Sequence, residues 1–256
     1  MKRLIFVALM FTISLETKAE EGHFGITTGL DYSTGKYGQS EATKIKYIPF
    51  IGKYEHDLWL VKVTVPWLQI EGPGGATGGD SKIIIADNAN KHTSESGLGD
   101  VVASITYTAF QSEEQKIILD VGAKVKFGTA SVKKGLGTGE NDYAVQLDAY
   151  KTLDKVTLLG TVGYKVLGDP KDLELYLHNV WYGTLGMAYK INNSNSAGLL
   201  LDLRQSTCYL NTNIREYTVY YSHRFNPTYK LQSYITAGDT MSSIDLGAGL
   251  MLGVSW

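Results

Sequence analysis

The chain is short of several features that mark common protein classes. It has one cysteine, Cys208, which excludes an internal disulfide framework and any cysteine-based metal cluster. We expect Cys208 to be a bystander in a loop. The formal net charge is −2, and no basic stripe indicates a nucleic-acid partner. Beyond Leu15, no apolar run approaches the ~20 residues that a membrane-spanning helix requires.

The first 19 residues have the organisation of a cleaved secretory signal peptide. Lys2 and Arg3 precede an apolar run from Leu4 to Leu15, and Thr17-Lys18-Ala19 follows it. The run is too short for a retained membrane anchor, and no cysteine follows the expected cleavage site, which argues against a lipoprotein. The sequence therefore predicts a signal peptide over 1–19 and one mature domain over 20–256.

The carboxyl-terminal segment shows the clearest pattern in the chain. From Ile244 to Trp256 every even position is apolar, and mostly Gly, Ser or Asp stands between these positions. Side chains alternate between the faces of a strand, so one face of this segment is continuously apolar. Lipid can cover such a face, and a terminal aromatic is typical of the closing strand of outer-membrane barrels. We expect Trp256 to serve as the signal for barrel assembly.

Similar alternation recurs along the chain in about twelve segments, joined alternately by short turns and longer loops. An even count leaves both chain ends on the periplasmic side. The two long Gly-rich loops cover about 71–97 and 129–141. This pattern predicts an all-β fold, a transmembrane antiparallel up-and-down β-barrel. The predicted strands are 24–32, two flanking the turn at 55–57 (the second covering 59–67), 101–109, 117–127, 143–149, 156–164, 181–189, 197–203, 217–223, 231–237 and 244–256.

Aromatic residues support the same layout, because barrels place aromatic rings at both membrane interfaces. A soluble β-sandwich or lipocalin-like barrel has no reason to sort its aromatics in this way. The loop ends of the predicted strands carry Tyr32, Trp67, Phe127, Tyr143, Tyr164 and Trp181. The turn ends carry Phe24, Tyr54, Trp59, Phe110, Tyr189, Phe225, Tyr229 and Trp256.

The opposite parity of each strand faces the lumen, where a transport route would lie. Charges of both signs occur there in similar numbers, so they can form a structural salt-bridge network that fills a narrow barrel. Alternatively, some of them form a polar constriction, for which Lys124 and Lys126 facing Asp148 are the best candidates. The remaining candidates for the constriction are Asp120, Arg204 and Glu216. The inward-facing polar positions are Asp31, Lys62, Asp100, Asp120, Lys124, Lys126, Gln146, Asp148, Lys165, Asp202, Arg204, Glu216, Arg224 and Asp245.

Two prolines suggest a weak point in the wall. Counted outward from the turn near His56, Pro49 and Pro66 lie at similar depth on neighbouring strands, and each lacks an N–H for the ladder. This patch is either a bulge that shapes the barrel or a lateral gate through which an apolar solute leaves. In the first long loop, Ile83, Ile84 and Ile85 form either a latch folded into the barrel or a hairpin above the membrane.

An enzymatic function is disfavoured by the positions of the histidines. Ser222 and His223 are adjacent and point to opposite faces of a strand, and His92 lies in a long polar loop. No Gly-x-Ser-x-Gly elbow occurs, and no His/Glu spacing suits a metal. We therefore expect no lipid hydrolysis, no catalytic residues, no metal and no cofactor.

Several short motifs resemble a known family. They are Gly97-Leu98-Gly99-Asp100, Lys124-Val125-Lys126-Phe127-Gly128-Thr129, Gly135-Leu136-Gly137-Thr138-Gly139, Asp142-Tyr143 and Gln146-Leu147. They resemble the outer-membrane β-barrel family associated with phenol meta-pathway degradation, which is related to barrels that take up fatty acids and aromatic hydrocarbons. One departure is Gly128, where the family pattern leads us to expect proline. The resemblance implies a barrel with a transport role and supplies no catalytic residues.

Together these features predict a channel in the outer membrane of a Gram-negative bacterium that passively admits small apolar or aromatic compounds. Its expected partners are outer-membrane lipids, the assembly machinery acting through the closing strand, and the solute itself. The alternative is a structural or surface-docking barrel without transport.

Overall fold

A computed structural model describes residues 22–73, 93–170, 176–209 and 211–256. It also describes the backbone of four short strands: β1 (Lys2–Arg3), β2 (Glu16–Thr17), β6 (Gly75–Thr77) and β7 (Ile83–Ile85). β1 pairs antiparallel with β2, and β6 pairs antiparallel with β7. In the described part of the chain, no helix is long and apolar enough to cross a membrane.

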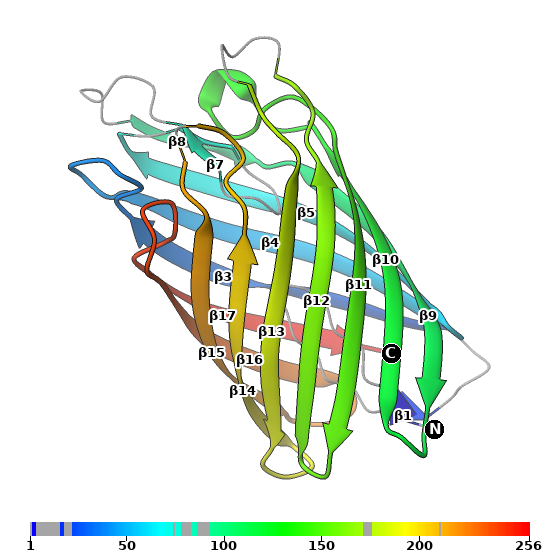
Figure 1. The fold of residues 1–256 in the computed structure, drawn as a ribbon. Coiled ribbons are helices and arrows are strands. Elements are labelled where there is room, and N and C mark those ends of the chain that lie inside the picture. The colour runs from blue at the N-terminus through cyan, green and yellow to red at the C-terminus, as the bar shows by residue number, and fades with distance from the viewer. Residues whose placement is uncertain are drawn as a thin grey trace.

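The main sheet is a closed antiparallel barrel of 12 strands, as the alternation predicts (Figure 1). β8 (Thr93–Leu98) and β9 (Val101–Ser112) follow each other along β5 and together make one side of the wall. Pairing of β4 with β5 and of β17 with β3 closes the ring. The other strands are β3 (His23–Gly35), β4 (Thr43–His56), β5 (Trp59–Gly72), β10 (Ile117–Phe127), β11 (Asp142–Leu153), β12 (Val156–Val166), β13 (Val180–Lys190), β14 (Asn195–Arg204), β15 (Ile214–Arg224), β16 (Tyr229–Gly238) and β17 (Leu246–Ser255).

Short turns lie at one end of the barrel and longer loops at the other, at the lower and upper ends of Figure 1. Asp57 and Asp154, with φ of 52° and 53°, lie in two of the tight turns. Both ends of the barrel segment meet on the turn side, where Phe24 and Trp256 exchange two backbone hydrogen bonds of 3.0 Å. Short turns are periplasmic in outer-membrane barrels, so the loop end is extracellular.

The outer surface of the wall is apolar. Within the described residues, no second protein layer covers this surface, so hydrocarbon is the medium that it fits. The two aromatic bands are also present, and neighbouring strands pair their rings, as Trp59 does with Tyr107 at 4.6 Å and Tyr164 with Trp181 at 5.1 Å. One exposed apolar residue from each strand, in chain order, is Phe24, Phe50, Val61, Ile105, Val121, Val145, Val162, Leu185, Leu199, Val219, Ile235 and Leu250.

The interior contains an apolar cluster in addition to the expected charges. This inner cluster consists of Tyr150, Leu159, Ala188, Leu200, Tyr220, Tyr234 and Met251. Glycine stands directly opposite its large members in the ladders, at the pairs Gly198–Tyr220, Gly249–Tyr234 and Gly186–Leu200. A Cβ at Gly249 would lie 2.2 Å from the Tyr234 ring, so the ring lies against the partner backbone instead of extending into the lumen.

The structure corrects two details of the predicted alternation. The closing strand begins at Leu246, and Ile244 is buried at 3% exposure inside the last loop instead of facing lipid, while Asp245 is exposed. In β9, Leu119 pairs with Phe110 and Asp120 with Thr108, so Ala109 is an extra residue. This bulge turns Phe110 outward even though its parity assigns it to the lumen.

Candidate functional site

The extracellular mouth is partly filled by the loop that joins β10 to β11, residues 128–141, which we call the mouth loop. It includes the one-turn 3₁₀ helix η1 (Val132–Lys134), which ends at Gly135 with φ of 66°. Leu136 of the mouth loop is 0% exposed and packs with Ile45 of β4 and with Leu68 and Ile70 of β5. These partners face inward, so the mouth loop folds over the inner wall of the barrel.

Tyr37, in the loop after β3, packs against the same apolar contact. Burial raises the pKa of its hydroxyl, and the negative charges of Glu216 and Asp245 raise it further.

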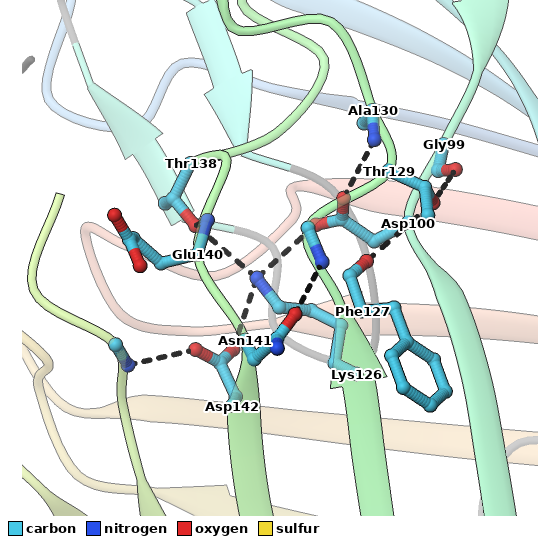
Figure 2. A network of polar contacts seen from close by, with 12 residues as sticks. Gly99, Asp100, Lys126, Phe127, Thr129, Ala130, Thr138, Glu140, Asn141 and Asp142 are labelled. Carbon is cyan, nitrogen blue, oxygen red and sulfur yellow. Dashed lines mark hydrogen bonds and ion pairs between the residues drawn. The ribbon is translucent and has the colours of Figure 1, made fainter.

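Lys126, near the end of β10, holds the mouth loop from below (Figure 2). Its Nζ forms ion pairs with Asp100 Oδ2 and with Asp142 Oδ2, both at 3.1 Å. It also donates a hydrogen bond to Thr138 Oγ1 at 3.2 Å. We call Lys126, Asp100, Asp142 and Thr138 the lysine cluster. Asp100 is 0% exposed, and Lys126 and Asp142 are also buried. Breaking such a buried ion pair leaves an uncompensated charge, which costs about 3–5 kcal/mol.

The remaining carboxylate oxygens of the lysine cluster bind loop backbone. Asp100 Oδ1 accepts from the Ala130 N–H at 2.9 Å, and Asp142 Oδ1 accepts from the Gly168 N–H at 3.1 Å (Figure 2). Charge-assisted hydrogen bonds of this kind are about twice as strong as neutral ones. The cluster thus fastens the mouth loop and the start of the next extracellular loop to the ends of the strands.

The lysine cluster unites the motifs that carry the family resemblance, and sequence reasoning did not find it. We expected Lys126 to face Asp148, but the ladder of β10 and β11 pairs Lys126 with Asp142 and Asp120 with Asp148. The error arises because a long loop does not fix the register of the strands that it joins. The sequence did contain a signal: each of four short motifs, three of them containing glycine, carries one member of the cluster, namely Asp100, Lys126, Thr138 or Asp142.

Gly128, the departure from the family pattern, has a physical reason. A Cβ there would lie 2.3 Å from the backbone carbonyl of Gly139, so the mouth loop crosses too closely for any side chain. The Gly128 N–H also donates to Asn141 Oδ1 at 2.9 Å, a bond that proline cannot make.

The other lumen candidates occupy the next level of the interior. Asp148 accepts from Gln146 Nε2 and from Thr161 Oγ1, both at 2.6 Å. Lys124 lies over the Tyr182 ring, with its Nζ 5.6 Å from the ring centroid. Nearer the extracellular end, Arg204 and Glu216 form an ion pair with an N–O distance of 2.5 Å.

Pro49 and Pro66 are direct cross-strand partners, and both are buried on the inner side of the wall. The ladders on both sides are interrupted at the same height. Between β3 and β4, pairing passes from Thr28–Phe50 to Asp31–Tyr47. On the other side of the proline pair, β5 pairs with β8 up to Trp67–Leu98 and with β9 from Thr64–Val102 onward. Residues 99–101 therefore lie opposite residues 65–66 and form a bulge. The Gly99 N–H closes this bulge by donating to the Pro66 carbonyl at 2.9 Å.

The remaining candidates are dispersed over the molecule. The backbone of Ile83, Ile84 and Ile85 forms a hairpin strand with β6, whereas His92 lies outside the described residues. Ser222 is buried on the inner face, and His223, on the other face, contacts Asn195 Oδ1 through Nδ1 at 2.7 Å. Cys208 lies in a loop and is buried as a free thiol. Within the described ranges, no group of three or more His, Cys, Asp or Glu side chains could hold a metal ion.

A closed antiparallel barrel with an apolar outer belt, aromatic rims and a partly charged interior defines a transmembrane β-barrel of the bacterial outer membrane. The chain belongs to the family described as "Putative MetA-pathway of phenol degradation", whose sequence profile matches residues 27–207.

Three solved structures have a similar fold. An outer membrane channel from Pseudomonas putida F1 aligns with a TM-score of 0.72 and 14% identity over 94% of this chain and 97% of that chain. The NanC porin has a TM-score of 0.59 and 10% identity over 90% of this chain and 98% of its own. The KdgM porin has a TM-score of 0.53 and 9% identity over 91% and 98% of the two chains. A search of curated proteins gave no match.

Proposed function

We propose that this barrel is a passive channel through which small apolar or aromatic compounds cross the outer membrane. The observation that carries the proposal is the inner cluster, in which three tyrosines and four apolar residues line the barrel interior. An ion-selective pore would have rings of charged side chains or backbone carbonyls at this level. The family description, which refers to phenol degradation, supports an aromatic solute, and the channel and porin folds of the similar structures support passive passage.

In this proposal the lumen candidates act in series. The mouth loop, held by Lys126, limits access from outside. Below it, Lys124, Asp120 and Asp148 form a polar constriction, and Arg204 with Glu216 reinforces the wall at the extracellular end. The segment Ile83–Ile85 of the first long loop acts as a latch.

The proline pair provides the exit in this proposal. Both prolines lack an N–H, and the ladders on the two sides of the β4–β5 pair are interrupted at the same height, so few ladder hydrogen bonds oppose opening here. An apolar solute that reaches the proline pair can leave sideways into the membrane instead of crossing the charged periplasmic end.

Replacing both prolines tests this route. Pro49→Thr combined with Pro66→Thr supplies two N–H donors to the ladder, so uptake of a radiolabelled monoaromatic compound by expressing cells should fall about tenfold, equivalent to ~1.4 kcal/mol on the opening step. Pro227→Thr, in an exposed periplasmic turn, is the matched control and should leave uptake unchanged. Unchanged uptake in the double variant rejects the lateral route. Equal uptake by cells with and without the protein rejects transport and favours a structural or docking barrel.

Two further parts of the proposal concern biogenesis. Residues 1–19 direct export and are then removed, and Trp256 presents the closing strand to the assembly machinery. The exposed Trp256 side chain and its backbone pairing with Phe24 support the second part. The proposal includes no catalytic step, in keeping with the channel and porin structures that the fold resembles.

A further inference from the structure

The periplasmic end of the lumen contains a cavity of about 260 Å³. Its wall includes the turns around Asp154 and Asn193 and the adjoining ends of β12, β13, β15 and β16. Ala188, a member of the inner cluster, also lines it, so the cavity ends against that cluster. Ser222 and Ala188 are buried on the inner face, whereas the adjacent Tyr221 and Tyr189 face lipid. The cavity therefore opens to the lumen and not to the membrane.

The charged residues that line this cavity are mostly cationic. Lys155, Lys190, Arg224 and Lys230 face it, with Asp154 as the acidic residue of its lining. Arg224 and Lys230 are direct cross-strand partners in the ladder of β15 and β16. Like charges at directly opposed positions repel and destabilise a sheet.

β4 brings one further charge of each sign to this end of the barrel. Lys53 of β4 lies within electrostatic range of Lys230 and repels it, as Arg224 does. Glu55 is 3.0 Å from Lys53 and balances that charge. The rest of the lining is neutral and consists mainly of hydroxyl and amide groups, which can donate hydrogen bonds.

We propose that this cavity binds a small oxyanion, a carboxylate or a phosphate, at the periplasmic exit of the lumen. An anion there accepts charge-assisted hydrogen bonds from Arg224 and Lys230. The volume is slightly below the range of drug-sized pockets, so it fits a small solute. This inference concerns binding alone and does not depend on the proposed passage of apolar solutes.

Calorimetric titration of the full chain in detergent tests the proposal with three probes. Benzoate and inorganic phosphate represent the two sources of an oxyanion, and benzyl alcohol is the neutral match of benzoate. Saturable binding of benzoate, of phosphate or of both supports the proposal and identifies the source, provided that benzyl alcohol binds at least tenfold more weakly. Absence of saturable binding of either anion, or equal binding of benzyl alcohol, overturns it.

Charge-removing variants locate the site. Arg224→Gln combined with Lys230→Gln should weaken anion binding at least tenfold, while Lys36→Gln combined with Lys133→Gln removes two exposed charges at the extracellular end and should leave it unchanged. Lys155→Gln, in an exposed turn, should give a smaller loss of about threefold, and it serves if the first variant fails to fold. Equal weakening by the extracellular control shows a general charge effect and overturns the assignment.

Discussion

The Lys126 ammonium illustrates how one residue can fix the shape of a channel mouth. Two carboxylates and a hydroxyl surround it where solvent barely reaches, and the carboxylates also bind two loop N–H groups. Removing the charge leaves Asp100 and Asp142 close together without a counter-ion. The cluster therefore tolerates the loss of its lysine poorly.

We expect Lys126→Met to lower the free energy of unfolding by about 3–5 kcal/mol, because two buried carboxylates lose their partner. Guanidinium unfolding of the barrel in lipid vesicles, followed by tryptophan fluorescence, measures the change. Lys133→Met, at an exposed position of the mouth loop, is the control and should change stability by less than about 0.5 kcal/mol. Similar losses in both variants would show that the cluster adds nothing beyond a surface charge.

The mouth loop depends on a second contact, the burial of Leu136 against β4 and β5. Together with the lysine cluster, this contact keeps the loop against the inner wall. The apolar contact is made by Leu136 and the polar contacts by Ala130 and Thr138, so a substitution can remove one kind of contact and leave the other.

Leu136→Asn should release the mouth loop, because burying an amide among aliphatic side chains without a partner costs about 1–3 kcal/mol. Conductance in planar bilayers should rise, with longer open periods than in the unaltered protein. Met241→Asn, an exposed apolar residue in another extracellular loop, should leave conductance unchanged. Lower or equal conductance in the Leu136 variant would show that the loop does not restrict the lumen.

Strands were the most predictable elements. β10 occupies Ile117–Phe127, the range that alternation predicts, because lipid on one side and water on the other impose a strict period of two. The prediction failed where a local event broke that period, at the Ala109 bulge and at Ile244. The partners of Lys126 were also missed, because register across the mouth loop depends on loop packing that no local pattern encodes. By contrast, the pairing of Pro49 with Pro66 was predictable, since a tight turn fixes the count.

The whole barrel depends on its outer surface meeting hydrocarbon. Leu147 lies at the middle of β11 and faces outward. Leu147→Arg should lower the free energy of unfolding in lipid vesicles by about 2–4 kcal/mol, the cost of a cation near the bilayer midplane. Guanidinium titration in the same vesicles measures the loss.

Tyr176→Arg offers a matched comparison, because Tyr176 is exposed in an extracellular loop, away from the wall. Its replacement should alter stability by less than about 0.5 kcal/mol. If both arginine variants unfold at the same denaturant concentration as the unaltered protein, the outward face of β11 does not meet lipid.

The junction of β3 with β17 has a consequence for the order of folding. Most neighbouring strands are joined by a single turn or loop and can pair locally, but Phe24 and Trp256 belong to opposite ends of the chain. The Tyr234 hydroxyl, which donates to Asp31 at 2.7 Å, spans a sequence separation of 203 residues across the same junction. Contacts between distant residues form late because loop closure costs entropy. Until the last residue has left the translocation machinery, the two edge strands remain unpaired, and the polypeptide requires protection from aggregation throughout that interval.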